Sequence, residues 1–343
     1  MPTLSETGRL PRRGVHIPYV HHNSSVIVNQ PALRLVQGSV LQFIGWLFGC
    51  ERTKVVDGIR TIGVTGAGGV IGRHLPLLIR RVMPGCQVSC YFGDIRDCDS
   101  AQAWAKEARP NLVFHLAAVV PTSVAAGDKE RALSVNELGP SDFARAVISG
   151  VGGRPLRFVY TSTSHVYGSS ERPIGEQGTI DPQNFYAQTK LGGEARLEEI
   201  ASENANFDLL ILRLFSIYSE HQAPNFLFPS LREKIRRTPG PQTIELRGWN
   251  NTRDFLHAQQ AADLLLQLGM TATGGVVNVG SGTARTIKEF AEYVFEVGLE
   301  VPEEYTDLHP TSLVADIGLL RAILGSERVS SVVIDSPRIG SLP

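Results

Sequence analysis

Short apolar runs alternate with longer stretches of helical periodicity through most of this chain. The run at 61–65 ends at a glycine, and a helical pattern follows it to about residue 83. The next expected elements are strands at 88–92, 112–117, 158–163 and 209–215, and helices at 100–108, 128–150 and 185–202. Strands that alternate with helices predict parallel β-structure, with right-handed crossovers and helices on both faces of the sheet. The continuous apolar run at 209–212 suits a sheet buried on both sides.

The pattern is looser after residue 218, where several prolines interrupt it. A helix at 257–268, a strand at 276–279 and a helix at 286–297 are expected there, followed by short elements. We therefore predict an α/β fold with a doubly wound parallel sheet and a smaller C-terminal lobe that is interleaved with it.

The first 57 residues differ from the rest. Residues 1–22 carry proline, arginine and histidine with little periodicity, so we expect a loose tail there, and residues 24–29 fit a short strand. An amphipathic helix is predicted from Pro31, with an apolar stripe at positions 33, 36, 40, 41, 44, 47 and 48. Such a stripe must be buried against this chain's own core, against a partner subunit, or over the active site.

Composition narrows the class of protein. The 343 residues are 42% hydrophobic and 20% charged, which is ordinary for a globular protein. A net charge of −1 provides no basic field for nucleic acid or for an anionic membrane. The four cysteines show no Cys-x-x-Cys pair and no histidines at ligand spacing, so we expect reduced thiols, no metal site and a cytoplasmic location. The apolar stretch at 33–48 is shorter than the roughly 20 residues that a bilayer requires.

A glycine-rich segment follows the first predicted strand. Its spacing is Gly66-x-x-Gly69-x-x-Gly72, between a strand and a helix. Glycine allows a tight turn and a close approach of the backbone to a pyrophosphate, and a helix N-terminus offers free N–H groups and a partial positive charge. The segment therefore predicts a dinucleotide site, and a purely structural turn is the alternative.

Three polar residues further along indicate redox chemistry. Tyr186 and Lys190 are four positions apart on a predicted helix, so they share one face. A lysine ammonium beside a phenol is expected to lower the tyrosine pKa and to make the tyrosine a usable acid or base near neutral pH. The hydroxyl of Thr163 would hold the substrate oxygen beside it. With a nicotinamide nearby, such groups interconvert a secondary alcohol and a ketone.

Together with these residues, further segments in the same order resemble the extended short-chain dehydrogenase/reductases, the NAD-dependent epimerase/dehydratase group that acts on nucleotide sugars. The segments that carry the resemblance are 64–72, 93–97, 115–118, 135–136, 161–168, 186–190, 212–215, 252–257 and 278–282. The resemblance covers about residues 60–325. It implies a Rossmann-type NAD(P)-binding domain at 58–218 and a smaller α/β substrate-binding lobe at 219–343, with residues 1–57 as an N-terminal extension.

The resemblance also implies roles for single residues. Thr163 would bond the reacting oxygen, Tyr186 would pass the proton, and Lys190 would bond the nicotinamide ribose. In the smaller lobe Arg253 would meet the substrate's diphosphate, because arginine forks match phosphate oxygens, and a surface ion pair with Asp254 or a neighbour is the alternative. The other expected cofactor-binding positions are Gly66, Gly69, Val70, Ile71, Gly72, Arg73, Asp94 and Ile95 (against the adenine), Leu116, Ala117 and Ala118 (under the cofactor) and Asn136 (holding backbone geometry). The other expected substrate-binding positions are Ser164, His165, Ser216 and Asn225.

Two departures from the family pattern affect the expected reaction. Ser164 and His165 stand where family dehydratases carry Asp-Glu, so neither a 4,6-dehydratase nor a decarboxylase of the UDP-glucuronate type is expected. His165 is either a second acid that faces the substrate or a residue that simply lies beside the strand. In the second lobe Ser216 replaces a frequent asparagine, so the nucleotide end of the substrate is expected to be held differently or not to be a nucleotide.

The first lobe is shortened as well. Asp94 follows Gly72 by only 22 positions, so one strand is expected where two would normally occur. Tyr91 and Phe92 then occupy the place of the acidic residue that binds the adenosine ribose. Arg73 is placed to contact a 2′-phosphate, so the cofactor is NAD or NADP, with NADP slightly favoured.

Three functions compete on this basis. The first is a 4-ketoreductase of a nucleotide-linked sugar, which the shortened first lobe favours because it fits a cofactor that exchanges. The second is a nucleotide-sugar 4-epimerase with tightly bound NAD, and the third is a non-catalytic nucleotide-binding protein. The helices at 128–150 and 185–202 resemble the pair through which such enzymes dimerise, so a homodimer is expected.

Overall fold

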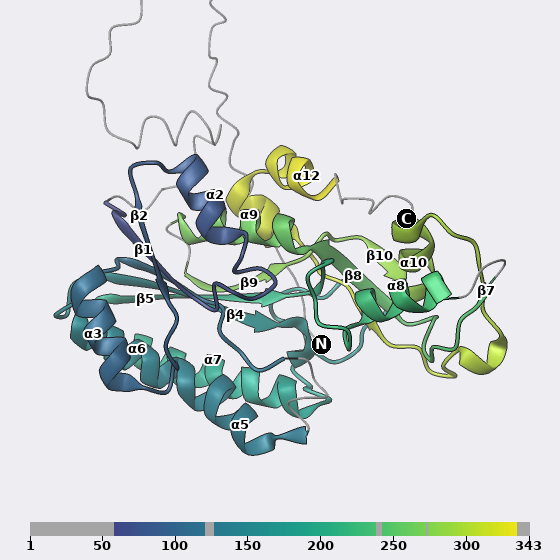
Figure 1. Cartoon of the computed structure of the whole chain (residues 1–343), viewed down its shortest axis with the longest axis horizontal. Helices are drawn as coiled ribbons and strands as arrows, with labels where there is room; N and C mark the ends of the chain where they lie inside the picture. The colour runs from purple at the N-terminus through teal and green to yellow at the C-terminus, as the bar shows by residue number, and fades with distance from the viewer. Residues whose placement is uncertain (1–57, 121–126, 238–241, 272–273, 335–343) are drawn as a thin grey trace, which may run out of the picture. The chain divides into compact units, whose positions relative to one another are not determined.

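The computed structural model describes residues 58–120, 127–237, 242–271 and 274–334 (Figure 1). The predictions made for residues 1–57, including the amphipathic helix, lie outside the described residues. None of the described helices is long and apolar enough to cross a membrane.

A parallel sheet of six strands forms the centre of the described structure, in the order β2-β1-β3-β4-β5-β9. The strands are β1 (Thr61–Thr65), β2 (Gln87–Tyr91), β3 (Leu112–His115), β4 (Leu156–Thr163), β5 (Phe207–Leu214) and β9 (Gly275–Val279). All five pairings between neighbouring strands are parallel. The predicted Rossmann-type α/β fold is thus confirmed.

Helices cover both faces of this sheet (Figure 1). On one face lie α2 (Leu75–Val82), α9 (Ala258–Gly269), α11 (Gly318–Leu324) and α12 (Ser326–Ile334), whose apolar residues share a core with β1 and β9. On the other face lie α3 (Cys98–Ala108), α6 (Gly139–Gly150) and α7 (Phe185–Glu203), packed on β3, β4 and β5. The alternation of apolar runs and helical patterns predicted these elements because each buries one apolar face against the sheet.

The first half of the sheet is short, as the spacing from Gly72 to Asp94 predicted. Within the described part of the chain, β2 pairs with β1 and ends the sheet, and the chain passes from β2 through α3 directly to β3. One strand therefore stands between β1 and β3 along the sequence.

The single helix expected over 128–150 is wrong in detail. The chain forms α5 (Lys129–Leu133), a π-helical turn η1 (Ser134–Leu138) and then α6, with the Gly139 amide donating to the Ser134 carbonyl five residues earlier. Pro140 has no N–H to donate to the carbonyl of Asn136, and a proline ring crowds the carbonyl four residues before it. The Asn136 carbonyl instead accepts a hydrogen bond from the Tyr160 hydroxyl at 3.2 Å.

A smaller lobe is built around a second sheet. Its strands β10 (Ala284–Thr286) and β12 (Ser312–Leu313) pair with β8 (Thr252–His257), which also pairs with β6 (Ser216–Tyr218). The lobe also contains α8 (Leu227–Arg237), α10 (Ile287–Phe295), the short pair β7 (Gln242–Thr243) and β11 (Leu299–Glu300), and the 3₁₀ turn η3 (Glu303–Tyr305). Its core consists of aromatic and aliphatic side chains that include Tyr218, Phe228, Leu231, Trp249, Phe255 and Phe290.

The sequence interpretation missed α8 and β8. The prolines after residue 218 predict an interrupted pattern, yet Pro229 occupies the first turn of α8, where the missing N–H of proline costs nothing. Strand β8 carries charged residues at 253 and 254, and its pairing on both sides is visible only in three dimensions.

Candidate active site

The glycine turn lies at the carboxyl end of β1, against the segment that follows β3. Gly66 has a φ of +66°, and a Cβ there would lie 2.7 Å from the backbone nitrogen of Ala117. A Cβ on Gly72 would overlap the carbonyl oxygen of Gly66, which accepts a hydrogen bond from the Gly69 amide at 2.9 Å. By contrast, a Cβ on Gly68 would meet nothing within 4 Å, so this side of the turn faces open space. The turn can therefore admit a pyrophosphate close to its backbone.

The regular helix after the turn begins later than expected. Residues 70–74 form successive turns, and α2 starts at Leu75 with His74 as its N-cap. Pro76 explains the delay because it cannot donate to the carbonyl of Gly72 and its ring crowds that carbonyl. Val70, Ile71 and Arg73 lie in these turns, and Arg73 is exposed.

The structure brings Thr163, Tyr186 and Lys190 to the carboxyl end of β4. Thr163 is the last residue of β4, and its hydroxyl is hydrogen-bonded to the Tyr186 hydroxyl. Tyr186 lies in the first turn of α7, which begins there because the Asn184 side chain accepts a hydrogen bond from the Ala187 amide at 2.9 Å. Lys190 follows one helical turn later and is only 1% exposed.

Lys190 is held in an unusual environment for an ammonium group. Its Nζ lies 4.0 Å from the centroid of the Tyr160 ring, and it makes no hydrogen bond or ion pair with any residue the structure describes. Burial lowers the pKa of Lys190 to about 7, and Glu194, one turn further along α7, opposes that shift. A buried ammonium with unused donors fits the hydroxyl groups of a nicotinamide ribose.

One expectation about this trio is wrong. The pKa of Tyr186 is raised to about 12 by burial rather than lowered by Lys190, and only the hydrogen bond to Thr163 opposes the increase. Because the pKa of Lys190 falls to about 7, the lysine has lost its charge at the pH where the phenol would ionise. Tyr186 therefore stays protonated at neutral pH.

Asn136 connects the backbone segments around the candidate site. It is fully buried, and its side chain accepts from the Val119 amide at 2.7 Å and donates to the Val119 carbonyl at 3.1 Å and to the Thr189 hydroxyl at 3.3 Å. It thus ties α7 to the segment after β3, where Leu116, Ala117 and Ala118 lie beside the glycine turn. The Thr65 hydroxyl accepts from the amides of Leu116 and Ala117 at 3.1 and 3.2 Å.

The substrate side of the site joins both lobes. Ser164 and His165 follow β4 in a 3₁₀ turn, η2 (Ser164–Val166). The pKa of His165 is lowered to about 4, first by burial and then by the nearby charge of Arg253 from β8. The Arg253 guanidinium donates to the Thr252 carbonyl at 2.8 Å and to the Thr311 carbonyl and hydroxyl at 2.9 Å each.

The structure also shows the partners of Asp254 and the places of the other expected substrate positions. The alternative ion pair between Arg253 and Asp254 is wrong, because the buried Asp254 carboxylate accepts instead from the amides of Ser281, Gly282 and Ala315. Ser216 begins β6 beside β8, and Asn225 is exposed in the segment before α8. Among the described residues no three histidine, cysteine or acidic side chains are grouped so as to hold a metal ion.

A buried ion pair that supports α7 was not predicted from the sequence. Glu194 and Arg213 form an ion pair at 2.6 Å, and Arg213 also donates to the Tyr167 hydroxyl at 2.9 Å. Glu194 continues the four-residue spacing from Tyr186 and Lys190, and this spacing is the signal that could have pointed to it.

His115, at the end of β3, gives the fold a testable pH dependence. It is fully buried between aromatic rings, and its pKa is lowered to about 3, mainly by burial and further by Lys190. Below about pH 6.5 the His115 imidazole becomes protonated in the unfolded chain, whereas in the folded chain it stays neutral down to about pH 3. The free energy of unfolding should therefore fall on acidification. The slope from this group reaches at most about 1.4 kcal/mol per pH unit.

Urea unfolding at pH 7.5, 6.5 and 5.5 checks this expectation. His115→Phe keeps the aromatic packing and removes the titration, so its stability should fall less steeply with acid, whereas His309→Gln at an exposed position should follow the parent chain. Equal slopes for the parent and His115→Phe would show that His115 does not control acid stability.

A glycine turn at the carboxyl end of a strand in a parallel sheet, with a threonine, a tyrosine and a lysine gathered at the end of another strand, is typical of dinucleotide-binding α/β proteins. The chain belongs to the NAD dependent epimerase/dehydratase family, whose model matches residues 62–280. This membership confirms the family predicted from the sequence motifs.

Curated relatives are nucleotide-sugar enzymes. The dTDP-4-keto-6-deoxy-D-glucose reductase of Streptomyces niveus is 32% identical over 51% of this chain and 59% of the relative, so the chain spans less than two thirds of that protein. The dTDP-4-dehydrorhamnose reductase of Streptomyces griseus is 32% identical over 63% of this chain and 67% of the relative. The UDP-glucose 4-epimerase of Neisseria gonorrhoeae is 26% identical over 71% and 84% of the two chains.

Solved structures share the fold and hold nicotinamide cofactors. The structure of RMD from Pseudomonas aeruginosa complexed with NADPH has a TM-score of 0.65 and 25% identity, and covers 81% of this chain and 97% of that chain. MoeE5 in complex with UDP-glucose and NAD has a TM-score of 0.63 and 23% identity, and covers 77% and 92% of the two chains. The family is NAD(P)-dependent, as predicted.

Proposed function

We propose that this chain is an NAD(P)H-dependent 4-ketoreductase of a nucleotide-linked sugar. The observation that carries the proposal is the gathering of Thr163, Tyr186 and Lys190 at the carboxyl end of β4, in the same parallel sheet as β1, whose carboxyl end carries the glycine turn. The reductases of Streptomyces niveus and Streptomyces griseus, each 32% identical to this chain, support this reaction. Ser164 and His165 provide no carboxylic acid for a dehydration.

The protonation state of the site suits reduction. A reduced nicotinamide, when bound, supplies the hydride. Tyr186, whose pKa of about 12 keeps its proton in place, donates that proton to the carbonyl oxygen, which becomes a hydroxyl. Thr163 orients the same oxygen through its hydroxyl. Lys190 would hold the nicotinamide ribose and, with a pKa of about 7, can return a proton to the Tyr186 phenolate after the transfer.

Arg253 supports a phosphorylated substrate. Its guanidinium is fixed by Thr252 and Thr311 and its charge acts on His165, so a positive group from the smaller lobe lies near the turn that follows β4. A fixed arginine fork suits the diphosphate of a nucleotide sugar.

The decisive experiment incubates the full chain with a panel of nucleotide sugars and their 4-keto forms, with NADH and with NADPH. We expect loss of the reduced-nicotinamide absorbance in proportion to the 4-keto sugar consumed, with the 4-hydroxy product identified by mass and NMR. Interconversion of 4-hydroxy epimers with tightly bound NAD and no net nicotinamide consumption would show a 4-epimerase instead. Failure to turn over any member of the panel would favour a non-catalytic nucleotide-binding protein.

We also propose a cytoplasmic homodimer. Helices α6 and α7 lie side by side on one face of the sheet, in the positions through which such enzymes are expected to pair (Figure 1). Three of the cysteines, Cys86, Cys90 and Cys98, are free thiols, which suits a reducing compartment. Light scattering on the purified chain measures the proposed dimer directly.

A further inference from the structure

The shortened sheet changes what Asp94 can contact. Strand β2 pairs with β1 in parallel, with Tyr91 opposite Thr65, so the segment after Tyr91 leaves the sheet beside the glycine turn. In dinucleotide-binding sheets, the strand next to the glycine-turn strand delivers the residue that contacts the adenosine ribose, about 20 residues after the turn. Asp94 follows Gly72 by 22 positions and comes after β2, the strand next to β1. It therefore occupies the position from which a side chain contacts the adenosine ribose.

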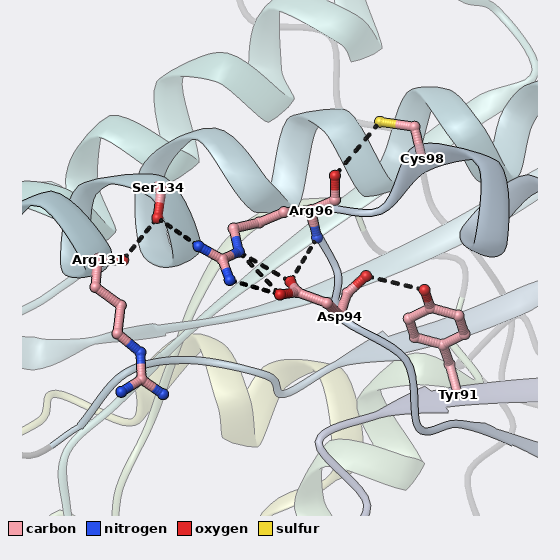
Figure 2. Close-up of polar contacts among 6 residues, drawn as sticks. All are labelled: Tyr91, Asp94, Arg96, Cys98, Arg131 and Ser134. Carbon is pink, nitrogen blue, oxygen red and sulfur yellow. Dashed lines mark hydrogen bonds and ion pairs between the residues drawn. The ribbon is translucent and has the colours of Figure 1, made fainter.

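The Asp94 carboxylate is already paired with the side chain of Arg96 (Figure 2). Its carboxylate accepts from Arg96 Nε at 2.9 and 3.1 Å, from Arg96 Nη2 at 2.6 Å and from the Arg96 amide at 3.0 Å. Tyr91 fixes the loop, because its hydroxyl donates to the Asp94 carbonyl at 2.9 Å. The pair is accessible, since the side chains of Arg96 and Asp94 are 46% and 48% exposed. A carboxylate engaged in this way is a poor acceptor for ribose hydroxyls, and its negative charge is offset by that of Arg96.

The same pair orients a second donor of Arg96. Because Nε and Nη2 are held by Asp94, Nη1 is directed at Ser134 on η1, where it donates to the hydroxyl at a long 3.3 Å. The Ser134 hydroxyl itself donates to the Arg131 carbonyl at 3.0 Å. Figure 2 shows Arg96 and Arg131 on the same side of Asp94.

Arg131 adds a second positive charge. Its charge contributes to lowering the pKa of Asp94 to about 2, an effect in which the hydrogen bonds from Arg96 are the largest cause. Among the described residues its guanidinium has no hydrogen-bond or ion-pair partner. Two arginines against one carboxylate leave the cluster positive, which matches a phosphate monoester.

We propose that Arg96 and Arg131 bind the 2′-phosphate of NADPH, with Asp94 acting as a positioning residue that holds the Arg96 guanidinium. This inference rests on the proposed function, since it names the cofactor form that the same site uses. The site would bind adenosine carrying a 2′-phosphate and discriminate against adenosine with a free 2′-hydroxyl.

Calorimetry with probes that lack the nicotinamide tests the assignment on the full chain. Adenosine 2′,5′-bisphosphate should bind at least about ten-fold more tightly than 5′-AMP, as charge-assisted hydrogen bonds imply. Arg96→Gln and Arg131→Gln should each reduce this preference by about ten-fold or more while leaving the affinity for 5′-AMP unchanged. Arg145→Gln is the matched control, because Arg145 is also an exposed arginine paired with a carboxylate, that of Glu203 at 3.5 Å.

The outcomes separate this inference from the proposed function. Equal affinity for the two probes, or a preference that survives both arginine substitutions, would overturn the assignment. So would a preference abolished by Arg73→Gln alone, which would place the phosphate at the exposed arginine after the glycine turn. If Asp94→Asn strongly reduced the affinity for 5′-AMP while the affinity for adenosine 2′,5′-bisphosphate stayed unchanged, Asp94 would itself bind the ribose hydroxyl and the proposal would fail. A preference for the 2′-phosphate without any ketoreduction would instead uphold the site and reject the reductase.

Discussion

Tyr186→Phe should lower turnover by roughly 10²–10⁴, the usual contribution of an acid–base group, with substrate and cofactor affinity little changed. The substitution removes only the hydroxyl that is hydrogen-bonded to Thr163 and keeps the ring that packs at the start of α7. Because the tyrosine pKa is raised to about 12, the phenol is the proton-donating form across the neutral range, so no other pH should restore the lost activity. Steady-state turnover and ligand dissociation constants measure the two effects separately.

Two further variants sharpen this test. Thr163→Val removes the hydroxyl that orients the reacting oxygen, and we expect a smaller loss than for Tyr186→Phe because the proton donor remains. Tyr305→Phe changes a tyrosine of the smaller lobe and should keep full turnover. Turnover close to that of the parent chain in Tyr186→Phe would remove the tyrosine from the mechanism.

The parts of the fold that sequence predicted are those with a strong local pattern. Strand β5 contains a continuous apolar run at 209–212 because both faces of the sheet are covered, and such a run can be recognised without neighbours. The glycine turn was recognisable for a similar reason, since a positive φ at Gly66 and the contact between Gly72 and Gly66 admit no side chain. The adjacent glycines at 192 and 193 allow η1 to approach α7 closely, because a Cβ at either position would collide with Glu137 or with the Asn136 carbonyl.

The parts that sequence did not predict depend on burial and pairing. The pKa of Tyr186 could not be deduced from a four-residue spacing, because the desolvation that raises it comes from the surrounding fold. The direction of the Asp254 carboxylate depends on a loop that returns from residues 281–282 and 315. The place of Asp94 beside the glycine turn followed from the strand order, and the count of residues alone left that order open.

The buried ion pair between Glu194 and Arg213 should dominate the stability of the contact between α7 and β5. The two side chains are 3% and 8% exposed and join α7 to β5, and Arg213 extends the network through the Tyr167 hydroxyl to Asn278 on β9. Glu194→Gln leaves a buried guanidinium without its counter-charge, which should reduce the free energy of unfolding by about 3–5 kcal/mol. Urea unfolding measures the loss, and the double variant Glu194→Leu with Arg213→Met should recover much of it, because apolar packing replaces the pair without an unpaired charge.

The same helix offers a matched control for this prediction. Arg196 pairs with Glu137 at 3.1 Å, but the two side chains are 43% and 22% exposed, so Arg196→Gln should cost only about 0–1 kcal/mol. Glu194 also opposes the loss of charge on Lys190, so Glu194→Gln should lower the lysine pKa further and change the pH dependence of cofactor binding. If Glu194→Gln destabilised the fold no more than Arg196→Gln, the pair would not support α7, and the position of Tyr186 and Lys190 would have to be maintained by the contacts of Asn136 and Tyr160 instead.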